Sequence, residues 1–440
     1  MNTTCPPRNP GRSVPFIIAM EACERFSFYG MVSILMLHLK NTLGMGEGPA
    51  KEALHLFKTG VYLLPLLGGF LADRWLGRYR TILWLSIFYC LGHGWIAVTD
   101  ASRSGLLVGL ALIALGAGGI KPCVSAFVGD QFEPGRKEHL ARVYGLFYAS
   151  INFGAFFGFA LVPWIRDHYG HRWAFGIPGA FMGVAAVVFW VGSRHYFRVP
   201  VASVESPASA VPSRSDGAWK AVSKVALVLL PVPVFWALYD QINTSWVVQG
   251  EKMTPFNVLG YRVDAERMQS FSALLVLAWV PILTLVVYPW MARRGRAGSP
   301  LARMQAGFGF AVLSFLLCAG IQRQIEGGAT LGLQWQMIQY TVLELGEVLV
   351  SATGLEFAYG HAPERHRGLV MSLWLLCTAL GNFLVASLTR LNTAVLKASG
   401  SMEFLLYAGL MGVAAVVFAF LARSLFGPRD ASEATHQAGA

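Results

Sequence analysis

Three ionisable residues lie close together in EACERFSFYG, residues 21–30, inside an apolar stretch that runs from about 14 to 39. Glu21 and Arg25 are four residues apart, so on a helix they share a face and can pair, and Glu24 lies about one turn from Glu21. Each charge at the centre of a membrane helix costs about 2.5–3.5 kcal/mol on insertion scales. In a hydrated cavity, carboxylates can exchange a proton and an arginine can bind an anion bidentately. The cluster predicts such a site; a static ion-pair network is the alternative.

Other apolar stretches are interrupted by Lys121, Asp240, Glu344, Glu347 and Glu356. Lys121 follows the glycines of GAGGIKP, which allow close helix packing, and Pro122 interrupts the backbone hydrogen bonds. A buried lysine needs an acidic partner, and we predict Glu347. Protonation of Glu347 would release Lys121, so the pair is a candidate gate. The alternative is that Lys121 extends to the membrane interface.

The composition indicates an all-α integral membrane protein. Of the 440 residues, 55% are hydrophobic and 13% are charged, and the mean hydropathy is +0.51; soluble domains average about 25% charged residues. Apolar stretches of about 20 residues are long enough to cross a bilayer. We predict twelve transmembrane helices, near residues 14–39, 53–73, 80–99, 105–125, 140–164, 173–192, 221–249, 268–290, 302–320, 333–359, 366–389 and 402–423.

The segment 193–220 is rich in Ser, Pro and Ala and contains no apolar stretch. We therefore predict an N-terminal six-helix bundle over 1–192, a cytoplasmic linker over 193–220, a C-terminal six-helix bundle over 221–423 and a cytoplasmic tail over 424–440. Two six-helix bundles suggest the major facilitator fold, in which substrate binds near the membrane midplane. The first, fourth, seventh and tenth helices line the cavity in that fold, and all four carry charged residues.

The distribution of positive charge predicts that both termini are cytoplasmic. With that orientation the inner segments hold 21 of the 35 Lys and Arg residues and the outer segments hold 12, with only Arg25 and Lys121 counted within the spans. Excess Lys and Arg in inner loops is typical of membrane proteins. The net charge of +11 therefore does not indicate nucleic-acid binding.

Six sequence blocks resemble the proton-dependent oligopeptide transporter family of the major facilitator superfamily. They occur in order along the chain: EACERFSFYG, GGFLADRWLGRYRTI, GAGGIKPCVSAFVGDQF, FYASINFGAF, FWALYDQ and GEVLVSATGLEFAYGHAP. They are distributed across about residues 21–382, which is most of the chain. No single block would be specific, but the ordered set is.

The resemblance implies roles for individual residues. Those implied in proton coupling are Glu21, Glu24, Arg25, His55, Asp240 and Glu347. Those implied in substrate binding are Arg25, Tyr29, Tyr62, Lys121, Asn152, Trp236, Glu347 and Trp374. Lys121, Glu347 and Asp73 are the implied gating residues, with Asp73 in a cytoplasmic hinge. Without the resemblance, His55 would be interpreted as an ordinary histidine near the outer interface.

Three positions depart from the family pattern. Val32 replaces an arginine that commonly pairs with the acid at Asp240, so we expect Asp240 either to find another donor or to titrate. Ser272 stands where many members have an asparagine, and Phe28 where a tyrosine is common. At these positions the family pattern does not predict how the outer gate and one part of the pocket are built.

We expect a proton-coupled symporter that imports di- and tripeptides by alternating access. No G-x-x-x-x-G-K-[ST] motif is present, so ATP is not the expected energy source, and we expect no enzyme activity, cofactor or metal. The expected location is the cell membrane, with a functional monomer. The alternatives are a transporter of nitrate or another small anion, a drug/proton antiporter, and a peptide sensor that does not transport.

Overall fold

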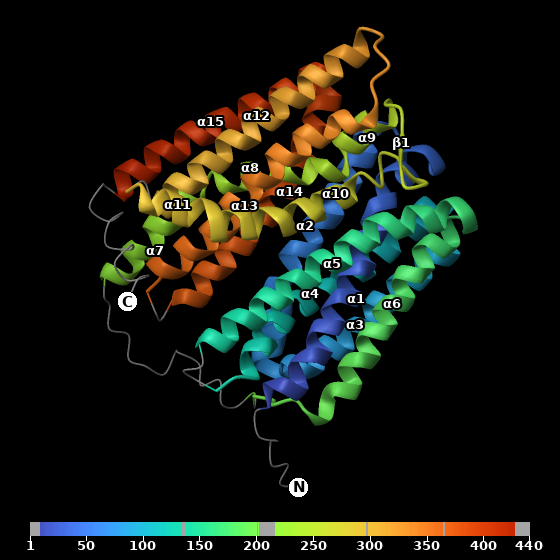
Figure 1. Ribbon diagram of the computed structural model, residues 1–440. Coiled ribbons are helices and arrows are strands. Elements are labelled where there is room, and N and C mark those ends of the chain that lie inside the picture. The colour runs from blue at the N-terminus through green and yellow to red at the C-terminus, as the bar shows by residue number, and fades with distance from the viewer. Residues whose placement is uncertain are drawn as a thin grey trace. The chain divides into compact units, whose positions relative to one another are not determined.

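The computed structural model describes residues 9–133, 137–199, 201, 216–295, 298–363 and 366–426, most of them helical (Figure 1). Each of the twelve predicted stretches is a helix or a helix interrupted by a turn. Ten described helices are long and apolar enough to cross a membrane. The two that fall short, α1 (Pro10–Leu37) and α13 (Gln336–His361), carry glutamates: Glu21 and Glu24 on α1, and Glu344, Glu347 and Glu356 on α13.

Contacts divide the chain into two compact units. The first contains Met1–Ala50 and Gly60–Ala210, and the second contains Lys51–Thr59 and Val211–Ala440. The helices of the first unit are α1, α2 (Glu47–Leu71), α3 (Arg78–Val98), α4 (Arg103–Asp130), α5 (Lys137–Tyr169) and α6 (His171–Val191). The division between the two units runs through α2, whereas the predicted boundary between the bundles lies at the linker 193–220. That boundary stays a prediction, and parts of the predicted linker (202–215) and tail (427–440) lie outside the described residues.

The second unit contains more, and shorter, helical segments. They are α7 (Asp216–Leu229), α8 (Val232–Tyr239), α9 (Ser245–Glu251), α10 (Gln269–Pro281), α11 (Tyr288–Arg293), α12 (Pro300–Glu326), α13, α14 (Arg367–Leu391) and α15 (Ser401–Leu425). An antiparallel hairpin, β1 (Phe256–Val258) and β2 (Tyr261–Val263), follows α9.

Two of the predicted continuous helices are interrupted. The stretch 221–249 forms three segments, because Pro231 cannot donate a backbone hydrogen bond between α7 and α8. A 3₁₀ turn at Asp240–Asn243 then separates α8 from α9. In the stretch 268–290, a π-helical turn at Ile282–Val287 follows Pro281. Interruptions of membrane helices leave backbone polar groups that need other partners, and they commonly line functional cavities.

Glycines on α4 allow it to contact both α2 and α3, as the GAGG sequence predicts. A Cβ atom on Gly118 would lie 2.4 Å from Cβ of Leu64 on α2, and one on Gly116 would lie 2.8 Å from the carbonyl oxygen of Leu85 on α3. The backbone of α4 is therefore held between two neighbours. This packing fixes the position of Lys121, which follows the glycines.

Close helix contacts also position the polar residues of the second unit. A Cβ atom on Gly307 of α12 would lie 2.7 Å from the carbonyl oxygen of Gly346 on α13. One on Gly381 of α14 would lie 2.7 Å from the carbonyl oxygen of Pro233 on α8. Helices α8 and α13, which carry Trp236 and Glu347, are thus held by backbone approach as well as by the apolar core.

We predict that Gly68→Ala destabilises the protein while the adjacent Gly69→Ala does not. A Cβ atom at Gly68 would lie 2.4 Å from Cα of Gly119, so a helix backbone must move, whereas a Cβ atom at Gly69 meets nothing within 4 Å. Overpacking of this kind costs about 1–3 kcal/mol, and alanine is favoured over glycine in an open helical position by up to about 1 kcal/mol. Thermal unfolding in detergent measures both variants. Equal melting temperatures would contradict the packing described.

Candidate functional site

Arg25 contacts two carboxylates on its own helix. Its Nε lies 2.7 Å from Oε1 of Glu21 and 2.8 Å from Oε2 of Glu24. All three residues are buried within the first unit. We call Glu21, Glu24 and Arg25 the α1 triad; it contains the predicted Glu21–Arg25 ion pair.

The α1 triad has one positive charge for two acidic groups. When both carboxylates are ionised its net charge is −1, and a single proton makes it neutral without leaving Arg25 unpaired. Glu21 Oε2 and Glu24 Oε1 find no hydrogen-bond partner among the described residues. Both described contacts of Arg25 are made by Nε, which leaves its terminal amino groups able to bind an anion. The triad can therefore exchange a proton and bind a carboxylate.

Helix α5 determines which side of α1 the triad occupies. A Cβ atom on Gly154 of α5 would lie 2.4 Å from the carbonyl oxygen of Ala22 and 2.9 Å from Cβ of Arg25. Only glycine allows α5 to pass this close to the triad. The alkyl part of Arg25 packs on that glycine, so its charged end is directed along α1.

Lys121 lies over two aromatic rings. Its Nζ is 4.3 Å from the centre of the Phe28 ring on α1 and 4.7 Å from that of Tyr62 on α2. A cation over a ring is stabilised by about 0.5–2 kcal/mol, depending on its desolvation. Phe28 can contribute this contact without the tyrosine hydroxyl that is common in the family. The predicted pairing of Lys121 with Glu347 stays a prediction.

Two further predicted residues of the first unit have local partners. Asn152 on α5 donates from Nδ2 to the carbonyl oxygen of Tyr148, 3.1 Å away. The ring of Tyr29 packs against Phe28 and Phe159, with centre-to-centre distances of 5.3 Å in both cases. Tyr29 and Lys121 therefore both contact the Phe28 ring, and Tyr62 contacts Lys121.

Asp73, the implied hinge residue, makes a long ion pair with Arg78. Its Oδ1 lies 3.9 Å from Nη2 of Arg78, and its side chain is 55% exposed. Arg78 is instead held by Asp130 at the end of α4, with Nη1 2.6 Å from Oδ1. The stronger contact of this loop motif thus joins the start of α3 to the end of α4.

The two buried glutamates in the middle of α13 differ in their partners. Glu344 accepts hydrogen bonds from the hydroxyls of Ser272 on α10 and Tyr239 on α8, the latter over 3.4 Å. Glu347 is 7% exposed, and its Oε2 has no hydrogen-bond partner among the described residues. Ser272 is therefore occupied by Glu344, and Glu347 has the carboxylate oxygen that can accept a cationic ligand.

Trp236 and Trp374 form an aromatic pair in the second unit. Their rings meet edge to face with centres 6.5 Å apart. The Trp374 ring lies against α13, where a Cβ atom on Gly354 would be 2.1 Å from it. The indole N–H of Trp236 has no partner among the described residues, so this apolar wall includes one available donor.

Asp240 has found another donor. In the turn between α8 and α9 its carboxylate pairs with Nζ of Lys58 and accepts a hydrogen bond from Nδ2 of Asn382 on α14. Lys58 is 3% exposed. Counting it with the outer loop cations was wrong, because it lies within the predicted span 53–73. Lys58 supplies the positive charge that Val32 lacks.

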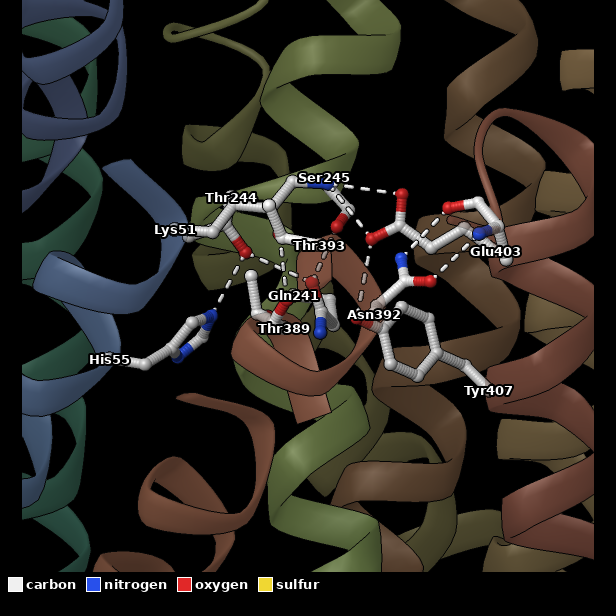
Figure 2. Close-up of polar contacts among 11 residues, drawn as sticks. Lys51, His55, Gln241, Thr244, Ser245, Thr389, Asn392, Thr393, Glu403 and Tyr407 are labelled. Carbon is white, nitrogen blue, oxygen red and sulfur yellow. Dashed lines mark hydrogen bonds and ion pairs between the residues drawn. The ribbon is translucent and has the colours of Figure 1, made fainter. Parts of the chain in front are cut away.

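His55 is fully buried, and both of its ring nitrogens have hydrogen-bond partners. Its Nδ1 lies 3.1 Å from Oδ1 of Asn382. Its Nε2 lies 3.1 Å from Oγ1 of Thr244, as Figure 2 shows. Because Asn382 donates to Asp240 through Nδ2, its Oδ1 accepts from His55 Nδ1–H. The Thr244 hydroxyl donates to Oε1 of Gln241 over 3.0 Å, so in this arrangement it can accept from Nε2–H of His55. To donate to a neutral Nε2, the hydroxyl would have to release Gln241.

Lys58, Asn382 and Asp130 are site residues that sequence reasoning missed. A lysine inside an apolar span was a usable signal for Lys58. Asn382 and Asp130 had no comparable signal, since Asn382 is an uncharged residue within α14 and Asp130 ends α4, where a charged residue is usually solvated. Their importance depends on partners distant in the sequence.

Comparisons with known proteins agree on the family. The family model described as "PTR2: POT family" matches residues 79–211 and 209–405. Peptide transporter family 1 of Drosophila melanogaster is 36% identical over 367 residues, covering 74% of this chain and 49% of that protein. Human solute carrier family 15 member 1 is 33% identical over 390 residues, covering 76% and 55%. The chain spans about half the length of the curated relatives it matches.

Solved structures agree on the fold. The crystal structure of the POT family transporter PepTSo has a TM-score of 0.87 and 33% identity, covering 95% of this chain and 99% of that one. An auto-inhibited POT family peptide transporter has a TM-score of 0.84 and 35% identity, covering 94% and 97%. The predicted major facilitator fold, with twelve transmembrane helices in two six-helix bundles, is confirmed. On sequence and structure alike, the chain belongs to the POT family.

Proposed function

We propose that the protein is a proton-coupled symporter that imports di- and tripeptides by alternating access. The observation that carries this proposal is the α1 triad, in which two buried carboxylates share one guanidinium. One proton changes its net charge from −1 to zero, and a peptide carboxylate can compete for Arg25. Proton binding and peptide binding thus act on the same cation. The names of the relatives, peptide transporters among them, support the same activity.

A di- or tripeptide has two charged ends and a backbone that every peptide shares. We assign its carboxylate to Arg25 and Lys121 and its ammonium to Glu347, whose Oε2 is available. The Asn152 amide and the hydroxyls of Tyr29 and Tyr62 suit backbone groups. The walls of Trp236 and Trp374 suit varied side chains, because aromatic surfaces contact them without requiring particular polar groups.

The proton gradient is the proposed energy source, with no cofactor. One positive charge crossing the membrane supplies about 2.3 kcal/mol per 100 mV, which supports a roughly 50-fold accumulation. We propose His55 as a proton entry residue, because the Thr244 hydroxyl can serve either protonation state of its Nε2 by keeping or releasing Gln241. Release of Lys121 from Glu347 on protonation is the proposed inner step of gating.

The proposed location is the cell membrane, with both termini cytoplasmic and a functional monomer. In this orientation Lys58 and Asp240 are gating residues toward the outside. Arg78, with Asp130 and the weaker partner Asp73, belongs to the cytoplasmic side. Asp240 is then a paired structural charge in the closed state, which explains how the chain tolerates Val32.

We predict that Glu24→Gln abolishes proton-driven accumulation of dialanine in proteoliposomes. The α1 triad would keep its arginine and one carboxylate but lose the second acidic group, so accumulation should fall from roughly 50-fold per 100 mV to none. Exchange of internal for external dialanine, which needs no net proton movement, should continue.

Glu133→Gln is the control, since Glu133 is an exposed glutamate and its neutralisation should leave accumulation intact. Accumulation by the Glu24→Gln variant equal to wild type would contradict the role of the triad. Competition by nitrate, or movement of drug outward under the same gradient, would favour the alternative cargoes.

We predict that Glu347→Gln removes the preference for a free peptide amino terminus. Loss of a charge-assisted hydrogen bond of about 1.5–3 kcal/mol should weaken dialanine binding about 10- to 100-fold. Binding of N-acetyl-dialanine, which has no ammonium group, should change little. Scintillation proximity or calorimetric binding assays measure both ligands. Glu344→Gln should retain the preference, because that carboxylate is occupied by Ser272 and Tyr239. Loss of the preference in Glu344→Gln but not in Glu347→Gln would assign ammonium binding to Glu344 instead.

A further inference from the structure

The N-terminal part of α2 presents three polar residues on one face. Lys51, His55 and Lys58 are spaced by four and three residues, so their side chains project from the same side of the helix. All three are buried. We call them the α2 polar face. His55 and Lys58 contact the network around Asp240, whereas Lys51 makes a separate contact that the mechanism above does not use.

Lys51 is paired with a buried carboxylate on α15. Its Nζ lies 2.9 Å from Oε1 and 3.1 Å from Oε2 of Glu403. The hydroxyl of Tyr407, one turn further along α15, donates to Oε1 of Glu403 over 3.2 Å (Figure 2). Lys51, Glu403 and Tyr407 form what we call the Lys51 site.

The α2 polar face explains why the division between the units runs through a helix. Lys51–Thr59 contact Glu403, Asn382 and Asp240, and they therefore group with the second unit, whereas α2 from Gly60 onward groups with the first. One continuous helix thus has two sets of packing partners. The first set is held by polar contacts and the second, at Gly68 and Leu64, by close backbone packing.

A buried ion pair is poorly suited to permanent attachment. Apolar residues of the same size often hold a protein together as well or better, because they carry no desolvation penalty. An ion pair differs in that each partner is stabilised by water when the contact opens. Glu403 lies in the first turn of α15, where the helix dipole favours a negative charge, and it keeps the Tyr407 hydroxyl. Lys51 lies near the start of α2, within reach of the interface.

We propose that the Lys51 site is a reversible gating contact of the transport cycle. It closes when the N-terminal part of α2 packs on α14 and α15, and it opens when that part separates from them. The proposal rests on the proposed function and adds gating residues, Lys51 and Glu403, to those assigned above. Opening of the site is a required step of peptide entry.

The test replaces the ion pair by apolar residues in the full chain, K51M/E403M, reconstituted in liposomes. We expect a melting temperature equal to or above wild type and unchanged dialanine binding. Uptake should fall at least about tenfold, because the closed state gains stability. Hydrogen exchange of residues 47–59 should slow. The charge-swapped variant K51E/E403K should recover uptake to within about threefold of wild type.

A control removes a different ion pair, between the partly buried Arg166 and the exposed Asp167. The variant R166M/D167N should keep wild-type uptake and hydrogen exchange. Wild-type uptake together with wild-type exchange in K51M/E403M would overturn the gating role. If the wild-type chain itself does not carry dialanine, the proposed function fails, and the exchange rates of residues 47–59 still decide whether the contact opens.

If K51M/E403M does not fold, a crosslinking experiment tests the gating role of the Lys51 site instead. Lys51→Cys and Glu403→Cys would be joined by a short, cleavable bifunctional thiol reagent, with the six native cysteines replaced. The crosslinked protein should bind dialanine without transporting it, and cleavage of the reagent should restore uptake. Transport by the crosslinked protein at the wild-type rate would overturn the proposal.

Discussion

Removing an ionised side chain from water costs several kcal/mol, and this cost organises the polar residues of the protein. Four cations within the spans have compensating contacts. Arg25 contacts Glu21 and Glu24, Lys58 contacts Asp240, and Lys51 contacts Glu403. Lys121 lies over the rings of Phe28 and Tyr62. The exceptions are informative: the α1 triad has one acid more than it has cations, and Glu347 has an available oxygen. At these two places a proton or a positively charged ligand can neutralise the negative charge that has no cation.

The same constraint explains how the chain differs from its family's usual pattern. Val32 is buried and apolar, so the acid at Asp240 needs a positive charge from elsewhere. Lys58 supplies it from α2, and Asn382 and His55 complete the hydrogen bonds. The acid is retained although its usual partner is lost. Helix α2 thereby gains a set of polar contacts along the face that begins at Lys51. The turn at Asp240–Asn243 provides the partner of Lys58.

The sequence predicted the parts of this arrangement that depend on local spacing. The apolar stretches located all twelve helices, because length and hydropathy are local properties. The Glu21–Arg25 pair followed from a spacing of four residues. Lys58 carried a usable signal, a lysine inside an apolar stretch, but its partner could not be predicted because it is 182 residues away. Asn382 is 142 residues from Asp240, and an asparagine has no signal of its own. Pro231 and Pro281 suggested where helices could break. Because membrane helices often tolerate proline, a proline by itself does not predict a break.

In this account the proton and the peptide carboxylate together rebalance the charges of the α1 triad, the proton on a glutamate and the carboxylate on Arg25, so neither enters alone. Proteoliposomes containing the wild-type chain, with the membrane potential clamped at zero, allow both to be measured at once. Adding dialanine outside should acidify the lumen as labelled peptide enters, with at least one proton per peptide. Entry of peptide with no change in luminal pH would contradict the claim.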